Sequence, residues 1–252
     1  MPTTPTSTPI PSGPGRGPLG HALAGLLDVL LPADCAGCGA ERAQLCPECR
    51  RALADTRPAP TLLPWAHAAA PYGDPFRRLL LAHKERGALR LAGPLGEVLG
   101  RAVRSALGPQ GERAPVLLVP MPSARPAVRA RGHDSTLRLA GAAARSLRRA
   151  GLDARAAPLL RHARPVADQA GLSAAERRRN LHGALTVLPR ARAALNGRHP
   201  VLVDDLVTTG ASLAEAARAL ADAGLPVRAA ATVAATSGHP AQAARATGGQ
   251  PA

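Results

Sequence analysis

Two adjacent acids and a hydroxyl-rich turn stand together between Val201 and Leu213, in the run VLVDDLVTTGASL. The aliphatic residues before the acids predict a buried strand, and the residues after the turn predict a helix. The carboxyl end of a parallel strand, next to a helix N-terminus, is where α/β proteins bind phosphorylated ligands. Asp204 and Asp205 would repel a phosphate directly. They suit vicinal ribose hydroxyls beside that phosphate, or a magnesium ion attached to them.

The turn itself has the groups that hold a phosphate. Gly210 lets backbone amides approach an anion without a Cβ clash, and Thr208, Thr209 and Ser212 add hydroxyl donors. The alternative is a strand whose acids merely cap the next helix. One acid would be enough for capping, so the combination favours a binding site.

All four cysteines fall in one short segment, with the spacing Cys35-x2-Cys38-x7-Cys46-x2-Cys49. Each C-x-x-C turn presents two thiolates, and two such turns complete the tetrahedral sulfur set that suits zinc. The alternatives are disulfides or unliganded thiols. A polar segment this small has little core of its own, which favours a metal. Because all four thiols are used, we expect the zinc to be structural.

The elements that position the acid pair alternate between strand and helix. Strands are predicted at Val116–Val119, Val201–Val203 and Val227–Ala234, with helices at Ser135–Ala150 and Ser212–Ala223. This order implies parallel strands joined by helical crossovers, an α/β fold. The remaining predictions are a strand at Trp65–Tyr72, helices at Leu19–Leu31, Pro75–Lys84 and Leu89–Leu107, and a loop from Pro120 to Arg131.

Changes in composition along the chain predict four segments. Residues 1–18 read as a disordered arm, 19–57 as a helix and four-cysteine finger, 65–236 as the α/β domain, and 237–252 as a disordered tail. A proline-punctuated linker, Pro58–Pro64, separates the finger from the domain.

The composition limits the core and the possible partners. Only Trp65, Tyr72 and Phe76 are Phe, Trp or Tyr, so the core must be built from Ala, Leu and Val. The net charge is +15, and of 32 Lys and Arg residues only Lys84 is lysine. Such a charge attracts polyanions, but GC-rich coding raises arginine in the same way, and we prefer that explanation of the count. No stretch is long enough to span a bilayer and no signal peptide is visible, so a cytoplasmic protein is expected.

The run from Val201 to Leu213 resembles the phosphoribosyl pyrophosphate (PRPP) motif of type I phosphoribosyltransferases. The resemblance implies a parallel sheet flanked by helices with a small hood, and magnesium bound with PRPP. It also implies that Asp204 and Asp205 hold the ribose hydroxyls at the catalytic centre. The 5′-phosphate would be wrapped by Thr208, Thr209, Gly210, Ala211 and Ser212.

Three further stretches resemble one branch of that superfamily, the ComF competence-protein family. The sequence VPMPS from Val119, followed by Arg125, Arg129 and Arg131, is similar to the pyrophosphate-side loop, although this chain reads RGHDS where many relatives read RGFNQ. The segment Gln169–Asn180 resembles the mobile flap and includes Arg177. A weaker match leads from Tyr72-Gly73 to Lys84 and Gly87. These resemblances imply that the four arginines and Lys84 bind PRPP.

Three functions remain open from the sequence. The first is a phosphoribosyltransferase with an unidentified nucleophilic acceptor, and the second is a non-catalytic PRPP- or nucleotide-binding protein of DNA uptake. The third is a nucleic-acid binder that works through the finger and the arginines. Candidate partners besides PRPP are single-stranded DNA and competence proteins. The sequence does not indicate an oligomeric state. The intact acid pair and phosphate turn argue against the third function. Between the first two we lean toward transferase chemistry as the biochemical function, and toward competence or DNA transformation as the process.

Overall fold

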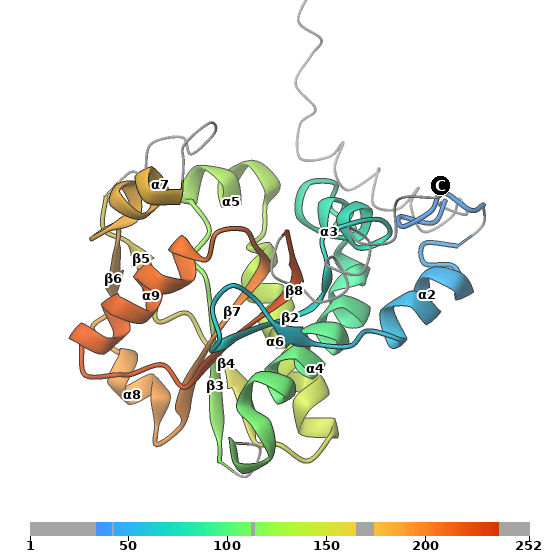
Figure 1. Cartoon of the computed structure of the whole chain (residues 1–252). Helices are drawn as coiled ribbons and strands as arrows, with labels where there is room; N and C mark the ends of the chain where they lie inside the picture. Colours follow the sequence, from blue (N-terminus) through green and yellow to red (C-terminus); the bar gives the residue numbers. More distant parts are fainter. Residues whose placement is uncertain (1–33, 42, 112–113, 165–173, 237–252) are drawn as a thin grey trace, which may run out of the picture.

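A computed structural model of the chain describes residues 34–41, 43–111, 114–164 and 174–236 (Figure 1). The predicted helix Leu19–Leu31 and the two predicted arms, 1–18 and 237–252, lie outside these residues. The helices are α2 (Pro47–Ala54), α3 (Phe76–Glu85), η1 (Leu89–Leu91), α4 (Ala92–Gly111), α5 (Arg125–Arg131), α6 (Ser135–Arg149), α7 (Ala174–Leu181), α8 (Ala191–Leu195) and α9 (Ala211–Asp222). In the part of the chain that the structure describes, no helix is both long and apolar enough to cross a membrane.

The main sheet has six strands in the order β1-β2-β8-β7-β3-β4. All neighbours are parallel except β1, which pairs antiparallel with β2 at the edge. The strands are β1 (Ala59–Pro60), β2 (Ala66–Pro71), β3 (Val116–Pro120), β4 (Ala154–Ala156), β7 (His199–Val207) and β8 (Ala229–Ala235). The predicted α/β class with a mostly parallel sheet is therefore confirmed.

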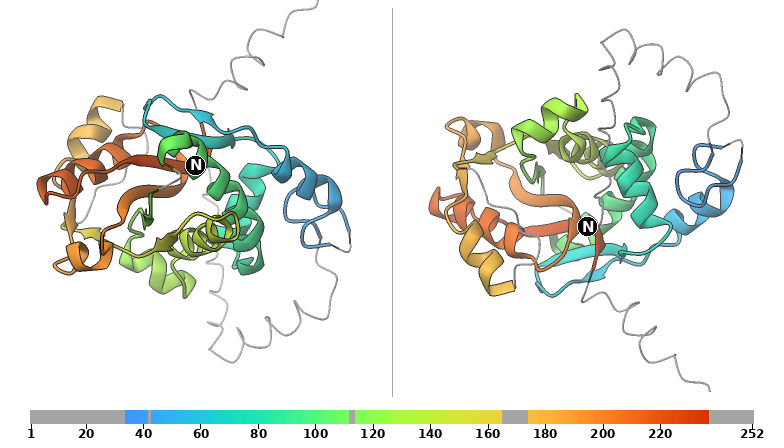
Figure 2. Two further views of the ribbon diagram at one scale, coloured as in Figure 1. Left: turned by 90° about the horizontal axis from the view of Figure 1, so that it is seen from below. Right: turned by 90° about the horizontal axis from the view of Figure 1, so that it is seen from above.

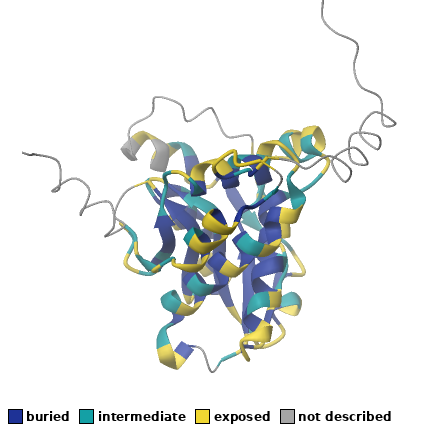
Figure 3. Cartoon of the chain, turned by 90° about the vertical axis from the view of Figure 1, so that its right-hand side faces the viewer, coloured by how far each residue is buried: buried dark blue, intermediate teal, exposed yellow. Residues whose placement is uncertain are grey.

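Helices cover both faces of this sheet, so its strands are buried on both sides (Figure 3). Along β7, Val201 and Val203 belong to the hydrophobic cluster that also contains residues of α4 and α6. Leu202 between them belongs to the opposite cluster, together with Leu213 of α9. This alternation explains why the strand reads as a continuous aliphatic run.

A second sheet of two antiparallel strands lies outside the main one, and we call it the hood sheet. It consists of β5 (Leu160–His162) and β6 (Leu185–Val187). Glu215 of α9 is buried and accepts a hydrogen bond from the backbone N–H of Leu185 at 3.3 Å. Arg218 on the next turn of α9 donates to the same carboxylate. These contacts fix the hood sheet to the main fold.

The structure differs from the sequence predictions in its short elements. The predicted loop Pro120–Arg131 is helical in its second half, where α5 forms. The predicted helix from Leu89 begins with a 3-10 turn and ends at a kink where Gly108 leaves the helical region. Strands β1, β4, β5 and β6 and helix α8 were not predicted, because two to five residues are too few to show a periodic pattern.

The helices α4 and α6 approach closely because small residues face each other. A Cβ atom on Gly96 of α4 would lie 2.5 Å from the Cβ of Ala142 on α6. The chain has only one Phe, one Trp and one Tyr, so large side chains cannot fill its core. Short distances between helices, made possible by small residues, keep the core closely packed instead.

We predict that Gly96→Ala destabilises the protein by about 1–3 kcal/mol, because the added methyl group overpacks the α4–α6 contact. The matched control is Gly93→Ala on the same helix, where a Cβ would meet no atom within 4 Å. That control should be neutral or slightly stabilising, since alanine favours helix. Denaturant unfolding measures both, and equal stabilities of the two variants would contradict the packing argument.

Candidate functional site

The acid pair lies at the carboxyl end of β7, the strand in the middle of the sheet. Asp205 accepts a hydrogen bond from Lys84 of α3, with Nζ and Oδ2 2.8 Å apart. Asp204 accepts a hydrogen bond at Oδ1 from the backbone N–H of Asp205 at 2.8 Å. The only lysine in the chain therefore reaches across 121 residues of sequence to one of the two acids.

The electrostatics of the pair differ from those of two surface acids. The carboxyl group of Asp204 is partly buried, and this burial raises its pKa well above the usual range, with the neighbouring charge of Asp205 adding to the effect. Burial lowers the pKa of Lys84, but the charge of Asp205 and the hydrogen bond to it outweigh this and leave that pKa raised. The site therefore places two carboxyl groups that disfavour each other's charge next to one ammonium group.

The turn after the strand has the shape expected of an anion-binding loop. Gly210 has φ +76° and ends the turn directly before α9. Thr208 is exposed, Thr209 and Ser212 are partly exposed, and the Thr209 hydroxyl accepts a hydrogen bond from the N–H of Ala211. The first amides of an α-helix have no acceptor within it and can bind an anion.

A residue of the predicted linker packs against this turn. A Cβ on Gly210 would lie 2.6 Å from Cδ1 of Leu63, so the leucine side chain would have to shift. The left-handed backbone of Gly210 strongly favours glycine at this position.

The arginines of the predicted pyrophosphate-side loop divide into different environments. Arg131, at the end of α5, pairs with Glu85 of α3 at 3.1 Å, which leaves its side chain largely buried. Arg129 is exposed, and Arg125 lies at the start of α5 on the wall of a cavity. The structure thus brings Arg131 close to the Lys84 helix and places Arg125 on a different side of the loop.

The three positions that depart from the related sequences lie between α3 and the start of α6, and the buried hydroxyl of Ser135 has no hydrogen-bond partner among the described residues. His133 packs against His83 of α3, with ring centroids 6.5 Å apart. Asp134 accepts hydrogen bonds from the N–H of Leu137, as the N-cap of α6, and from the hydroxyl of Ser123. The carbonyl of Ser135 faces Nε2 of His83 at 3.3 Å. These positions therefore connect the loop to α3 and to the start of α6.

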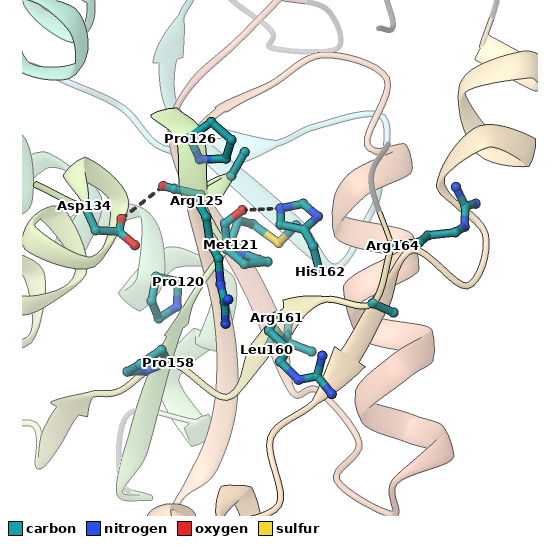
Figure 4. Close-up of a pocket in the computed structure, with 14 residues that line it drawn as sticks. Pro120, Met121, Arg125, Pro126, Asp134, Pro158, Leu160, Arg161, His162 and Arg164 are labelled. Carbon is teal, nitrogen blue, oxygen red and sulfur yellow. Dashed lines mark hydrogen bonds between the residues drawn. The ribbon is translucent and has the colours of Figure 1, made fainter. Parts of the chain in front are cut away.

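A cavity of about 620 Å³ lies between the loop that follows β3 and the hood strand β5 (Figure 4). The register Pro120↔Val203 places the loop directly beside the strand that carries the acid pair, and the N–H of Met121 donates to the carbonyl of Val203. His162 of β5 closes the far side through a ring nitrogen 3.0 Å from the carbonyl of Pro122. Asp204 and Asp205 do not line this cavity; they lie one strand further along the same edge of the sheet.

The structure describes only part of the predicted flap, Gln169–Asn180. Arg177 lies in α7, but its side chain is outside the described residues, as is the segment 165–173. Arg164, which precedes that segment, donates hydrogen bonds to the carbonyls of Asn180 and His182. The proposed contact of Arg177 with PRPP remains a prediction.

The four cysteine sulfurs form a single cluster, all within 4.8 Å of one another. A zinc ion with bonds of about 2.3 Å to sulfur needs sulfur atoms about 3.8 Å apart, so the donor set fits zinc. Burial raises the pKa of Cys35, but backbone N–H groups directed at its sulfur outweigh this and lower it to about 6. The cluster is therefore compatible with a structural zinc, and the thiols are free rather than joined in disulfides.

The cysteine cluster belongs to the main hydrophobic core. Cys35, Cys46 and Cys49 are buried in the same cluster as Leu79 and Leu80 of α3. A Cβ on Gly37 would meet the sulfur of Cys49 at 2.6 Å, so the knuckle itself is tightly packed. Figures 1 and 2 show α2 and this segment beside α3, at the end of the molecule away from α9.

We predict that Cys38→Ser lowers both the zinc content and the melting temperature. Cys38 is the exposed member of the cluster, so the change removes a ligand with little loss of packing. Metal analysis and a thermal melt measure the two effects. The exposed neighbour Ala40→Ser is the control and should keep its zinc. Full zinc content in Cys38→Ser would contradict the four-sulfur site.

We predict that Asp204→Asn raises the stability of the ligand-free protein at neutral pH. The folded-state pKa of Asp204 lies above its unfolded value, so the stability supplied by its protonated form is complete below the unfolded pKa of about 3.9 and is lost as the pH rises through the folded pKa. Asparagine keeps the acceptor for the Asp205 N–H and does not titrate. Thermal melts from pH 4.5 to 8 should show an advantage of the variant that grows with pH; a constant difference would contradict the assigned cause.

Comparison with known proteins agrees with this geometry. The family model described as the phosphoribosyl transferase domain matches residues 137–250, and no curated protein matches the chain. The chain therefore combines a phosphoribosyl transferase domain with an N-terminal four-cysteine cluster. The match contains the acid pair and the turn. Lys84, the loop after β3 and strand β2 lie before it, and the structure joins them to the same sheet.

The sequence did not identify the residues of the hood side of the site. Arg161 and His162 lie on a strand of three residues, which no periodic pattern could reveal. Asp134 could have been recognised, since an acid directly before a predicted helix is a typical N-cap.

Proposed function

We propose that this protein binds PRPP with magnesium and transfers its phosphoribosyl group to an acceptor. The observation that carries the proposal is the acid pair at the end of β7, held by Lys84 and followed at once by the glycine turn that opens α9. A ribose between a phosphate turn and two carboxylates matches the chemistry of those groups.

The proposed roles follow from which atoms are already used. Lys84 occupies Oδ2 of Asp205, and the backbone occupies Oδ1 of Asp204. One oxygen of each carboxylate remains for the ribose 2′ and 3′ hydroxyls or for a magnesium ion, which prefers oxygen donors. Magnesium, when bound, would neutralise the charge of the diphosphate.

The remaining residues would hold the two phosphate ends of PRPP. Thr208, Thr209, Gly210, Ala211 and Ser212 would bind the 5′-phosphate through amides and hydroxyls. Arg125, Arg129, Arg131, Lys84 and Arg177 would bind the diphosphate, because guanidinium groups match its oxygens. The bond between ribose C1 and the acceptor nitrogen forms as the bond from C1 to the diphosphate oxygen breaks. The diphosphate leaves with the electron pair. An amine nitrogen then loses a proton to water, whereas a ring nitrogen that carries no hydrogen keeps the positive charge.

The acceptor would enter through the cavity beside β3. The cavity is lined by the loop after β3 and by the hood strand β5, and β3 is the neighbour of β7, which carries the acid pair. An acceptor in the cavity would therefore lie next to a ribose held by the two acids. The zinc of the cysteine cluster has no part in the reaction in this proposal, since all four sulfurs are needed to hold it.

The place of the protein in DNA uptake is proposed on the ComF resemblance alone. That resemblance joins a four-cysteine finger to a PRPP-type domain, the combination present in this chain. A non-catalytic PRPP sensor and a nucleic-acid-binding module of the transformation machinery remain the alternatives. Release of pyrophosphate from PRPP would distinguish the transferase from the sensor.

Calorimetric titration with PRPP and magnesium tests the proposal. We predict binding by the wild type, and a loss of affinity of at least about 10-fold in the double variant Asp204→Asn, Asp205→Asn, because both ribose contacts lose their charge.

The control variant is Asp222→Asn, an exposed acid on α9 that should leave binding unchanged. Thermal melts establish that both variants are folded. Absence of PRPP binding by the zinc-loaded wild type would refute the proposed function.

A further inference from the structure

The lining of the cavity beside β3 has a chemical character that restricts its ligand. Its apolar surface comes from Pro120, Met121, Pro158 and Leu160. Among the described residues that line it there is no Phe, Tyr or Trp to stack on a base, and no Asn or Gln to read a base edge. A neutral nucleobase is usually recognised by those groups, so the cavity is poorly suited to one.

The polar lining is strongly positive. Three arginines, Arg125, Arg161 and Arg164, face one acid, Asp134. Asp134 is engaged as the cap of α6 and by Ser123, and Arg164 is engaged by the backbone carbonyls of the α7 region. The excess charge disfavours a cationic amine as the ligand.

Two of these arginines have no neutralising partner in the part of the chain that the structure describes. Within the described residues, no hydrogen bond or ion pair involves the guanidinium of Arg125 or Arg161. Figure 4 shows that they come from different elements, Arg125 from the start of α5 and Arg161 from the hood strand β5. Two guanidinium groups beside apolar lining residues form a place for an anionic group on a small, partly apolar molecule.

We propose that the acceptor is a small anion, a nitrogen nucleophile that carries a carboxylate or a phosphate, and that Arg161 binds this group. The proposal rests on the proposed function, since it assigns the cavity to the acceptor. Arg161 comes from the hood strand and is not among the residues proposed to hold PRPP. It is therefore a specificity residue for the acceptor, and Arg125 lies between the acceptor and the diphosphate.

The experiment measures pyrophosphate release and equilibrium binding with PRPP and magnesium present, using acid and neutral forms of the same acceptor. The pairs are pyridine-3-carboxylate with pyridine-3-carboxamide, 2-aminobenzoate with 2-aminobenzamide, and 3-aminophenyl phosphate with 3-aminophenol. The first two pairs test a carboxylate and the third a phosphate. We expect at least one anion to be preferred over its neutral partner by about 10- to 100-fold, the usual effect of a charge-assisted pair.

Two variants show whether Arg161 is responsible. Arg161→Gln should reduce the affinity for the preferred anion to that for its neutral partner, with PRPP affinity unchanged. Arg155→Gln, an exposed arginine on β4 outside the cavity, should alter neither.

The two levels of the proposal fail separately. If PRPP binds normally but no anion binds better than its neutral partner, or if Arg161→Gln keeps the preference, the anionic acceptor is wrong and the proposed function stands. If PRPP does not bind at all, the proposed function fails and this inference fails with it.

Discussion

The contact between Lys84 and Asp205 is the interaction on which the rest of the site depends. Two adjacent carboxylates at the end of a central strand repel each other, and burial of one of them makes its charged form still less favourable. A cation at 2.8 Å from the second carboxylate offsets this. The acid pair can stand at the carboxyl end of β7 because α3 brings that one lysine to it.

Helix α3 packs against the cysteine segment, and Arg78 of α3 donates a hydrogen bond to the carbonyl of Gly37 at 3.4 Å. Leu79 and Leu80 of α3 lie in the same hydrophobic cluster as Cys35, Cys46 and Cys49. A metal in the cluster would fix this end of the core, and through it the helix that carries Lys84. The finger then acts on the site through packing, although it lies away from the acid pair.

The use of lysine at this one position has a physical reason in a chain that otherwise uses arginine. An ammonium is a compact point charge on a flexible stem, whereas a guanidinium is a wide planar group. Lys84 places one nitrogen on a single oxygen of Asp205 and leaves the other oxygen for a ligand. The arginines around the neighbouring cavity suit the opposite task, because their broad groups match carboxylate and phosphate oxygens.

The sequence by itself predicted the motifs on which the proposed chemistry depends. The acid pair, the glycine turn and the four cysteines each lie within a short segment. Their roles could therefore be predicted from local spacing alone. The long aliphatic strands and amphipathic helices were likewise readable, since their patterns repeat over enough residues. The predicted helix Ser135–Ala150 and the observed α6 differ by one residue at the C-terminal end.

Only the tertiary structure decided which distant residues meet these motifs. Lys84 was notable in the sequence for being the only lysine, but its contact with Asp205 depends on how α3 packs on the sheet. The division of Arg125 and Arg131 between a cavity wall and an ion pair with Glu85 depends on the turn of α5, a helix too short to predict. Strand β5, which carries Arg161, has only three residues. It pairs with β6, whose Leu185 N–H donates to the buried Glu215 of α9. Contacts between segments far apart in the chain arise from packing of the whole core, which no local pattern encodes.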